Sequence, residues 1–447
     1  MVDDPRFVRA RAAKRWDRIG KSSRLHRGVH RLPKLIDAVA TFLFGYPFVM
    51  SWYWMVGGVM FALVRGRHEP DPRTPPPLPS YPLVSLLVPC HNEAEQLDET
   101  VAALAAITYP NFEVIAIDDG SRDDTGARLE AAARRHPWLR VVRLLANQGK
   151  SVALNTGVTF ARGELLVCMD GDSMIDPFAL HWFVRRFQLD PKVGAISGNP
   201  RIRNRTSLLG HLQVGEFSSI VGLIKRTQSL YGILFTVSGV ICAFRKRAVL
   251  DAGLWAPEAL TDDVDLTLRL QLEGWRAVYE PGALAWILMP ETLRGLWRQR
   301  VRWSEGGTQA ILATTRRVFS WDHARLIPVW LNYMVSIVWA YSVLTALVLG
   351  IGLLVLPDGL IPVSGVGLIP DWWGALLLVT YLFQAFLSTV VDRRSEEGLL
   401  RSLFWVVWYP LVFWVLQAAT AVVGFPRAIL RDRSARGVWV SPDRGIR

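Results

Sequence analysis

Residues 165–172 read Leu-Leu-Val-Cys-Met-Asp-Gly-Asp, and this stretch decides the fold class of the chain. Its first five residues are apolar, which indicates a strand buried on both faces, as in parallel sheets. Asp170 and Asp172 follow directly, so we expect two carboxylates at the carboxyl edge of a sheet, where open α/β folds hold ligands. Two nearby acids more commonly form a solvated turn, so the pair alone is a weak signal.

Segments with strand and helix patterns alternate around this stretch. We predict strands over residues 83–89, 113–117, 140–144 and 164–169, and helices over residues 93–106, 124–135 and 151–161. Short connections between such segments favour a parallel sheet covered by helices on both faces, a Rossmann-like α/β domain. No Gly-x-Gly-x-x-Gly and no Walker A loop occurs, which argues against a dinucleotide or ATP phosphate cradle.

Long apolar runs indicate that the chain also enters a membrane. Of its 447 residues, 51% are hydrophobic, and residues 35–64 carry one charge. Three later runs, 327–356, 372–391 and 402–426, are each long enough to cross ~30 Å of hydrocarbon. We therefore predict one transmembrane segment at 35–64 and three more within 327–426. Pro47 and Pro410 leave open that the first or the last run is re-entrant.

These patterns divide the chain into seven parts. They are a basic N-terminal segment (1–34), a transmembrane segment (35–64), a proline-rich linker (65–82), a catalytic domain (83–290), interfacial amphipathic helices (291–326), three apolar transmembrane segments (327–426) and a basic tail (427–447). The net charge of +12 collects beside the apolar runs, which favours contact with anionic lipid headgroups. Because no nucleic-acid module motif occurs, we expect no nucleic-acid partner. The three cysteines stand in apolar contexts without metal-ligand spacing, as is typical of buried reduced thiols.

Polar residues follow the first two predicted strands. Asn92 and Glu93 come after the first strand and Asp119 after the second, so all three are candidates to hold a nucleotide at the sheet edge. Helix capping explains such residues equally well. Lys150 follows Gly149, which permits a tight turn, and its ammonium group is a candidate phosphate contact. A lysine without a ligand, exposed at the surface, is the alternative.

Two further motifs lie outside the predicted strands. Asp262 and Asp263 begin an amphipathic stretch, where the helix dipole alone favours acidic residues. However, three acidic clusters at one sheet edge would repel one another unless a cation or separate roles justified them. Residues 299–303, Gln-Arg-Val-Arg-Trp, lie in a stretch typical of a helix on a membrane surface. Its guanidinium groups can pair with a diphosphate, and its indole can stack on a sugar.

Together these motifs resemble the signature of membrane-integrated processive family 2 glycosyltransferases, which include cellulose, chitin and hyaluronan synthases. The motifs are Asp119-Gly120, Asp170-Gly171-Asp172, Thr261-Asp262-Asp263 and residues 299–303, in this order. Longer stretches, residues 198–205, 213–225, 286–292 and 439–446, are similar to bacterial poly-β-1,6-N-acetyl-D-glucosamine synthases. The resemblance implies a GT-A type catalytic domain.

The resemblance also implies a role for each motif. Asp170 and Asp172 would coordinate Mg²⁺ or Mn²⁺ on the diphosphate of UDP-N-acetylglucosamine (UDP-GlcNAc), while Asn92, Glu93, Asp119 and Lys150 would help to bind the nucleotide. Asp263 would be the base that takes the proton from the acceptor hydroxyl. Asp262 is a second catalytic candidate beside it, at a position where the family usually has glutamate. The group of residues expected at the diphosphate and the acceptor sugar is Gln299, Arg300, Arg302 and Trp303.

The function implied is polymerisation of N-acetylglucosamine into a β-1,6-linked biofilm polysaccharide, together with its translocation. The resemblance further implies a multi-pass protein of the bacterial inner membrane with a cytosolic catalytic domain. It also implies a small membrane partner subunit and control by cyclic di-GMP. A hyaluronan- or chitin-type synthase and a non-processive transferase to a lipid carrier are the alternatives. The chain could also be a membrane scaffold without catalytic activity. In that case all the motif residues would have to serve only as helix caps or as surface residues.

Overall fold

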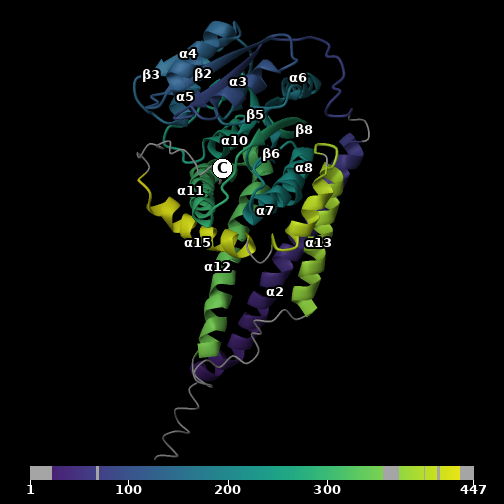
Figure 1. Ribbon diagram of the computed structural model, residues 1–447. Coiled ribbons are helices and arrows are strands. Elements are labelled where there is room, and N and C mark those ends of the chain that lie inside the picture. Colours follow the sequence, from purple (N-terminus) through teal and green to yellow (C-terminus); the bar gives the residue numbers. More distant parts are fainter. Residues whose placement is uncertain (1–22, 67–69, 356–371, 397, 410–412, 433–447) are drawn as a thin grey trace, which may run out of the picture.

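The computed structural model describes residues 23–66, 70–355, 372–396, 398–409 and 413–432. An α/β domain lies above three long helices that run away from it: α2 (Ser23–Phe61), α12 (Ile327–Val355) and α13 (Trp372–Asp392) (Figure 1). The chain passes through α2 first, builds the α/β domain, and returns through α12 and α13. The predicted combination of an α/β domain and apolar helices is confirmed.

One eight-stranded sheet forms the centre of the α/β domain. Its strands, in spatial order, are β3 (Leu139–Leu144), β2 (Phe112–Asp119), β1 (Val84–Cys90), β4 (Leu165–Met169), β7 (Ile241–Arg245), β6 (Val193–Ile202), β8 (Arg276–Ile287) and β5 (Met174–Ile175). The first four run parallel, as predicted. Beyond β4 the sheet is mixed, because β7 is antiparallel to both β4 and β6.

The strand register brings distant segments to one edge of the sheet. Cys90 pairs with Asp118, and Asp119 pairs with Leu144, so β1, β2 and β3 end together. Because β7 is antiparallel to β4, its first residue, Ile241, pairs with the last residue of β4, Met169. The loop that enters β7 therefore lies at the edge where the parallel strands end.

Helices cover both faces of the sheet. In β1, Leu86 belongs to the hydrophobic cluster on one face and Leu87 to the cluster on the other. The helices on the first face are α3 (Leu97–Ala105), α4 (Thr125–Arg135) and α6 (Ala179–Leu189), and those on the second are α5 (Lys150–Phe160), α9 (Lys246–Asp251) and α10 (Asp262–Leu272). This burial on both faces explains why the strands are continuous apolar runs.

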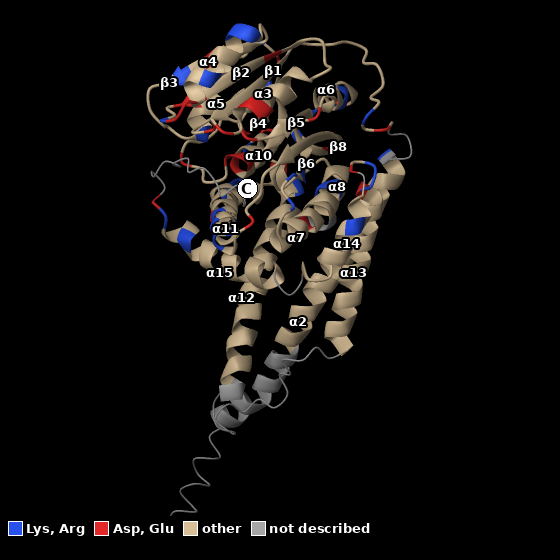
Figure 2. Ribbon diagram, in the orientation of Figure 1, with Lys and Arg blue, Asp and Glu red and all other residues tan. Residues whose placement is uncertain are grey.

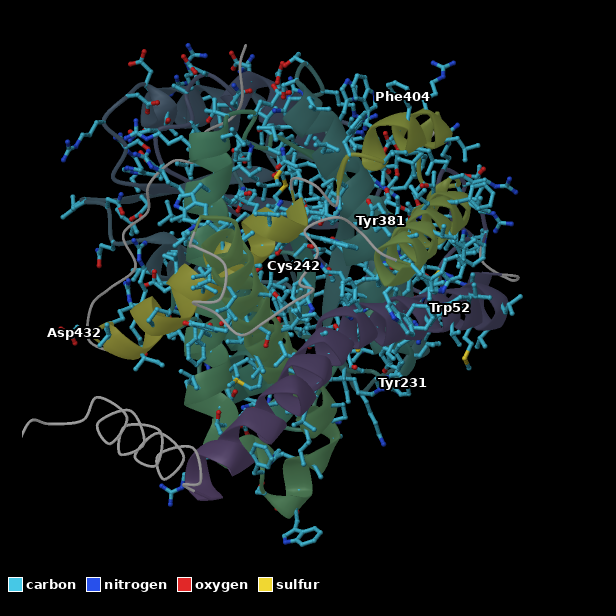
Figure 3. The ribbon with its side chains drawn as sticks, turned by 90° about the horizontal axis from the view of Figure 1, so that it is seen from below. Trp52, Tyr231, Cys242, Tyr381, Phe404 and Asp432 are labelled. Atoms are coloured by element: carbon cyan, nitrogen blue, oxygen red, sulfur yellow. The ribbon has the colours of Figure 1, made fainter. Side chains whose placement is uncertain are left out.

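Three stretches are long and apolar enough to cross a membrane: Ala38–Arg65, Trp321–Gly352 and Trp372–Asp392. They carry few charged side chains over most of their described length (Figure 2). Seen from below, Trp52 and Tyr381 mark α2 and α13 (Figure 3). The rings of Trp52 and Phe383 lie 6.1 Å apart, so these two helices pack against each other.

The run 402–426 differs from the transmembrane segment that we expected there. Its longest described helix is α15 (Val415–Leu430), which has 16 residues and spans only about 24 Å at 1.5 Å per residue. In Figure 1, α15 lies across the base of the α/β domain instead of along α12. Two residues of this run, Tyr409 and Gln417, donate to Oε1 of the buried carboxylate Glu216 and so tie the run to α7 (Leu208–Glu216). Pro410 lies outside the described residues.

The proline-rich linker packs on α6. His181 Nε2 donates to the carbonyl oxygen of Pro76 at 2.6 Å, and Trp182 Nε1 donates to that of Pro72 at 2.9 Å. Side chains of one helix thus hold two points of the linker. The described part of the linker is thereby anchored to the α/β domain.

Candidate functional site

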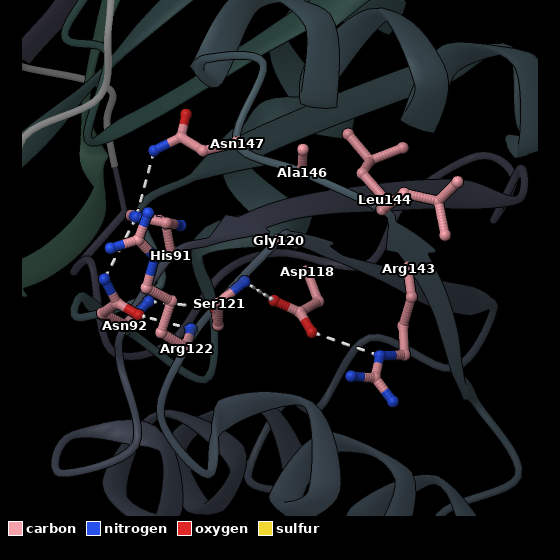
Figure 4. Close-up of a pocket in the computed structure, with 11 residues that line it drawn as sticks. His91, Asn92, Asp118, Gly120, Ser121, Arg122, Arg143, Leu144, Ala146 and Asn147 are labelled. Atoms are coloured by element: carbon pink, nitrogen blue, oxygen red, sulfur yellow. Dashed lines mark hydrogen bonds and ion pairs between the residues drawn. The ribbon is translucent and has the colours of Figure 1, made fainter.

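A cavity of about 710 Å³ opens where β1, β2 and β3 end (Figure 4). Its lining comes from the loops that follow these strands and consists of His91, Asn92, Asp118, Gly120, Ser121, Arg122, Arg143, Leu144, Leu145, Ala146 and Asn147. Polar groups and a short apolar wall are both present. A nucleoside needs this combination, because its base is flat and apolar on its faces and polar at its edges.

His91 has a defined tautomer at the rear of this cavity. Its Nδ1 lies 2.8 Å from the carbonyl oxygen of Asp119, which can only accept, so Nδ1 carries the proton. Nε2 then accepts hydrogen bonds from the side-chain amides of Asn92, at 3.1 Å, and Asn147, at 3.0 Å. The imidazole of His91 therefore joins the loops after β1 and β3.

Asn92 and Asp118 shape the cavity wall. Asn92 has a φ of 55°, in the left-handed region that asparagine tolerates, and its Oδ1 accepts from the Arg122 amide at 2.9 Å. Asp118 Oδ1 accepts from the Ser121 amide at 3.0 Å, and its Oδ2 lies 3.3 Å from Arg143 Nε. The structure thus places the predicted residue Asn92 at the cavity. It adds Asp118, whose role the sequence prediction assigned to its neighbour.

Asp119 and Glu93 lie next to the cavity without lining it. The two carboxylate oxygens of Asp119 accept from the amides of Gln148 and Gly149, each at 2.8 Å, and so fix the turn that leads to Lys150. Gly149 has a φ of 93°, which a residue with a side chain rarely adopts. Glu93 is buried beneath Gly171. Asp119 thus shapes the loop that leads to Lys150, and a direct contact of Asp119 or Glu93 with a nucleotide stays a prediction.

Lys150 faces the acidic cluster. Its Nζ lies 2.5 Å from Asp170 Oδ1 and 3.9 Å from Asp262 Oδ2, and it donates to the Gly239 carbonyl oxygen at 3.2 Å. Burial by itself would lower the pKa of Lys150, but the carboxylates of Asp170, Asp262 and Asp263 outweigh it and raise that pKa. Lys150 is therefore a permanent cation at the meeting point of two of the three acidic motifs.

A tight turn presents Asp170 and Asp172. The Gly171 carbonyl oxygen accepts from Thr100 Oγ1 at 2.8 Å, and the Ser173 amide donates to the Asp170 carbonyl oxygen at 3.1 Å. In the part of the chain that the structure describes, no three His, Cys, Asp or Glu side chains form a complete metal cage. Two carboxylates fit a Mg²⁺-type ion well, because that ion commonly takes its other ligands from water and substrate phosphates.

Asp263 lies in the first turn of α10 and faces the loop before β7. Its Oδ2 accepts from the Gly239 amide at 3.1 Å, and its Oδ1 accepts from the Val264 amide at 2.9 Å. Burial, together with the charge of Asp262, raises the pKa of Asp263, and Lys150 counteracts this rise only in part. A carboxylate with a raised pKa is better suited to take a proton from a hydroxyl group than an ordinary aspartate is.

Helix α11 (Leu293–Val318) carries residues 299–303 to this site. A Cβ atom at Gly306 would lie 2.6 Å from Thr261, so α11 meets the start of α10 closely there. Trp303 precedes Gly306 by about one turn and is partly exposed. Arg302 is exposed as well, and both remain candidates for contact with a diphosphate or a sugar.

The structure places Arg300 differently from our expectation. Its Nη2 forms a 2.6 Å ion pair with Glu216 of α7 (Leu208–Glu216), and both residues are buried. The guanidinium also lies 4.5 Å from the centre of the Trp303 ring. Gln299 is similarly turned inward, with its amide nitrogen 3.9 Å from Met289 Sδ. Arg300 thus orients Trp303 and anchors α11 instead of pointing into the cavity.

The site therefore combines a cavity, a carboxylate pair, a buried cation and a carboxylate with a raised pKa. Sequence reasoning missed the loop residue Gly239 and the pairing partner Glu216: Gly239 stands in a stretch without a motif, and residues 213–225 were singled out only as a whole, with no role for Glu216. His91 and Asn147 adjoin predicted positions at strand ends, and their polarity at such ends was the available signal.

Comparisons with known proteins agree with this arrangement. A family model described as Glycosyltransferase like family 2 matches residues 81–306. The chain is 35% identical over 408 residues to the poly-beta-1,6-N-acetyl-D-glucosamine synthase of Staphylococcus aureus, which covers 90% of this chain and 98% of that protein. For the synthase of Staphylococcus epidermidis the identity is 35% over 421 residues, or 91% and 98% of the two chains.

A solved structure supports the fold. A mannosyltransferase from Pyrobaculum calidifontis in complex with GDP-Man and Mn²⁺ matches with a TM-score of 0.61 at 20% identity, covering 88% of this chain and 97% of that chain. The prediction of a GT-A type domain is thereby confirmed.

Proposed function

The chain belongs to glycosyltransferase family 2, and from this premise we propose that it polymerises N-acetylglucosamine from UDP-GlcNAc into a β-1,6-linked polysaccharide. The observation that carries the proposal is the position of Asp263: it interacts with the same Lys150 that pairs with Asp170, at the sheet edge where a nucleoside-sized cavity opens. The identity of 35% over nearly the whole length of two synthases supports this polymer over other products.

The cavity and the carboxylate pair divide the work of holding the donor. The loops with His91, Asn92 and Asp118 would hold uridine, with exposed Leu145 as an apolar wall. Asp170 and Asp172 would hold a divalent cation, Mg²⁺ or Mn²⁺, on the diphosphate, as two carboxylates commonly do. When bound, the cation supplies positive charge that stabilises the leaving diphosphate. Lys150 adds a fixed positive charge at the same place.

Asp263 would take the proton from the acceptor hydroxyl while that oxygen attacks the anomeric carbon of the donor. The bond from this carbon to the diphosphate oxygen breaks as the new glycosidic bond forms, so the α-linked donor yields a β-linked product. The Gly239 and Val264 amides fix both oxygens of Asp263 and hold it in place to act. Trp303 would support the acceptor sugar by stacking, with Arg302 nearby.

We extend the proposal to the setting of the enzyme. The apolar helices would hold it in the bacterial inner membrane as a multi-pass protein with a cytosolic catalytic domain, because nucleotide sugars are cytosolic. Translocation of the polymer, a small membrane partner subunit and control by cyclic di-GMP complete the proposal through the family resemblance. Full polymerisation by the purified single chain, with no response to added nucleotide, would contradict the partner and the control.

The decisive experiment is a radiolabelled-sugar assay on the protein purified in detergent. We expect UDP-GlcNAc with Mg²⁺ or Mn²⁺ to give a polymer that a β-1,6-specific hexosaminidase degrades, and we expect none with the Asp263→Asn variant. A polymer that resists this enzyme would point to a chitin- or hyaluronan-type synthase. A lipid carrying one sugar as the sole product would point to a non-processive transferase.

A further inference from the structure

A buried lysine lies behind the loop that supports Asp263. Lys225 belongs to α8 (Leu223–Leu230) and is 6% exposed. Its Nζ donates to Ser197 Oγ at 2.8 Å and to Ser238 Oγ. The proposed mechanism gives the Lys225 side chain no role, although burying an ammonium group costs free energy.

Ser197 completes a clamp on Ser238. The hydroxyl of Ser197 accepts from the Ser238 amide at 3.1 Å as well as from Lys225, and it donates to the Gly198 carbonyl oxygen at 3.0 Å. Ser238 is thus held through its backbone by one partner and through its side chain by the other. Since Ser197 lies in β6, the clamp ties the loop to the sheet.

The next residue of the loop touches the reactive groups. The Gly239 amide donates to Asp263 Oδ2 at 3.1 Å, while its carbonyl oxygen accepts from Lys150 Nζ at 3.2 Å. A Cβ atom at Gly239 would lie 3.2 Å from the same Asp263 oxygen. Any shift of residues 238–239 would therefore move the partners of both Asp263 and Lys150.

The charge of Lys225 acts on the same carboxylate. Among the described residues, no carboxylate forms an ion pair with Lys225. Desolvation lowers the pKa of Lys225 to about 8, and Asp263 of α10 and Cys242 of β7 are the groups that oppose this. Figure 3 shows Cys242 in the interior of the molecule. Lys150 and Asp262 face Asp263 from its other sides.

We propose that Lys225 is a positioning residue for Asp263: together with Ser197 it fixes Ser238, and thereby the Gly239 amide that holds the Asp263 carboxylate. This inference rests on the proposed role of Asp263 as the proton acceptor. It assigns to α8 a task that a purely structural lysine would not have. Thr227 Oγ1 of α8 donates to the Trp54 carbonyl oxygen of α2 at 3.2 Å, so Lys225 belongs to a helix that contacts an apolar helix long enough to cross a membrane.

The test compares Lys225→Met, which removes the charge and the donors, with Ser238→Ala, which removes one acceptor and keeps the charge. UDP release from UDP-GlcNAc by detergent-purified full-length protein gives kcat and KM across pH, and calorimetry gives UDP affinity. Lys246→Met is the matched control, because Lys246 follows β7 at the opposite edge of the sheet. We expect kcat to fall roughly 10- to 100-fold in both variants, the loss typical for a supporting partner of a site residue.

The pH profile separates positioning from a structural role. In Lys225→Met the acidic limb of kcat should move to higher pH, because Asp263 loses a nearby positive charge, and the alkaline limb near pH 8 should vanish. Ser238→Ala should keep both limbs, and in both variants kcat should change more than UDP affinity or KM, because the cavity that would bind uridine lies on other loops. An unshifted limb in Lys225→Met, or full kcat in Ser238→Ala, overturns the proposal. If Lys225→Met fails to bind UDP, the kcat of Ser238→Ala decides the matter.

These outcomes are independent of the polymer. If the wild-type protein releases UDP but forms no β-1,6-linked product, the proposed function fails. The ratio of variant to wild-type UDP release still reports on Lys225.

Discussion

Replacing Asp263 with asparagine removes the proposed proton acceptor with little change in shape. In the structure, both carboxylate oxygens are engaged, one by the Gly239 amide and one by the Val264 amide. Asparagine offers a single acceptor oxygen, so one of these two backbone N–H groups loses its partner. The substitution therefore has a chemical effect and a smaller structural one, and their sizes can be compared.

The chemical effect is the larger of the two. Loss of a general base costs about 10²- to 10⁴-fold in rate, or roughly 2.7–5.4 kcal/mol at about 1.36 kcal/mol per factor of ten. One lost backbone hydrogen bond costs about 1 kcal/mol. We expect kcat for polymerisation to fall at least 100-fold, as the general-base range requires. UDP affinity should change little, because the cavity that would bind uridine lies on other loops.

Radiolabelled polymer and UDP release measure the rate, and calorimetry with UDP confirms that the variant is folded. Asp265→Asn is the matched control, because Asp265 lies in the same helical turn and pairs with Arg269. In the wild-type protein the raised pKa of Asp263 should place the acidic limb of kcat above the usual aspartate value of about 3.9. Residual polymerisation above about a tenth of the wild-type rate, far more than loss of a general base permits, would refute the assignment.

Three further predictions concern the rest of the site. Asp172→Ala should abolish the part of UDP binding that Mg²⁺ or Mn²⁺ supports, and equal UDP affinity with and without chelator in the wild-type protein would contradict the metal role. Arg300→Met should lower thermal stability in detergent, because removing one member of a buried ion pair costs about 3–5 kcal/mol; an equal loss in the exposed control Arg302→Met would contradict this. Gly120→Ala should weaken UDP binding, because residue 120 has a φ of 61° and a Cβ atom there would lie 2.5 Å from the neighbouring loop; unchanged calorimetry would show that the loop adapts.

The parallel half of the sheet could be predicted from the sequence, and the other half could not. β1, β2, β3 and β4 begin and end within about two residues of the predicted strands, because each is an apolar run between polar turns. β6 and β8 each contain a proline, Pro200 and Pro281, which argues against a strand when only the sequence is known. β7 follows a longer apolar stretch, where period and length do not separate strands from buried helices. The antiparallel direction of β7 depends on pairing with β4, which no local pattern records.

The site, too, could be predicted from the sequence only in part. Its acids could be located because each follows a strand or begins a helix, but their orientation could not. Asp118 and Asp119 are neighbours on β2, so their side chains point to opposite faces, and only the three-dimensional structure shows which one faces the cavity. Likewise Arg300 and Arg302 lie on one helix, and burial of Glu216 decides which arginine is an anchor.

That buried carboxylate also changes the expected membrane arrangement. If α2, α12 and α13 each cross the bilayer once, the chain returns after α13 to the side of the catalytic domain, and α15 then lies on that side. The described contacts agree: Arg431, just after α15, forms a 3.3 Å ion pair with Glu305 of α11, and Gly424 packs against Ser304. A fourth crossing would have put the basic tail outside, against the tendency of arginines to stay on the cytosolic side. We propose that Glu216, by holding Tyr409 and Gln417 against the domain, keeps the 402–426 run from crossing, which would put Arg427 and Arg431 on the same side as the arginines that precede α12.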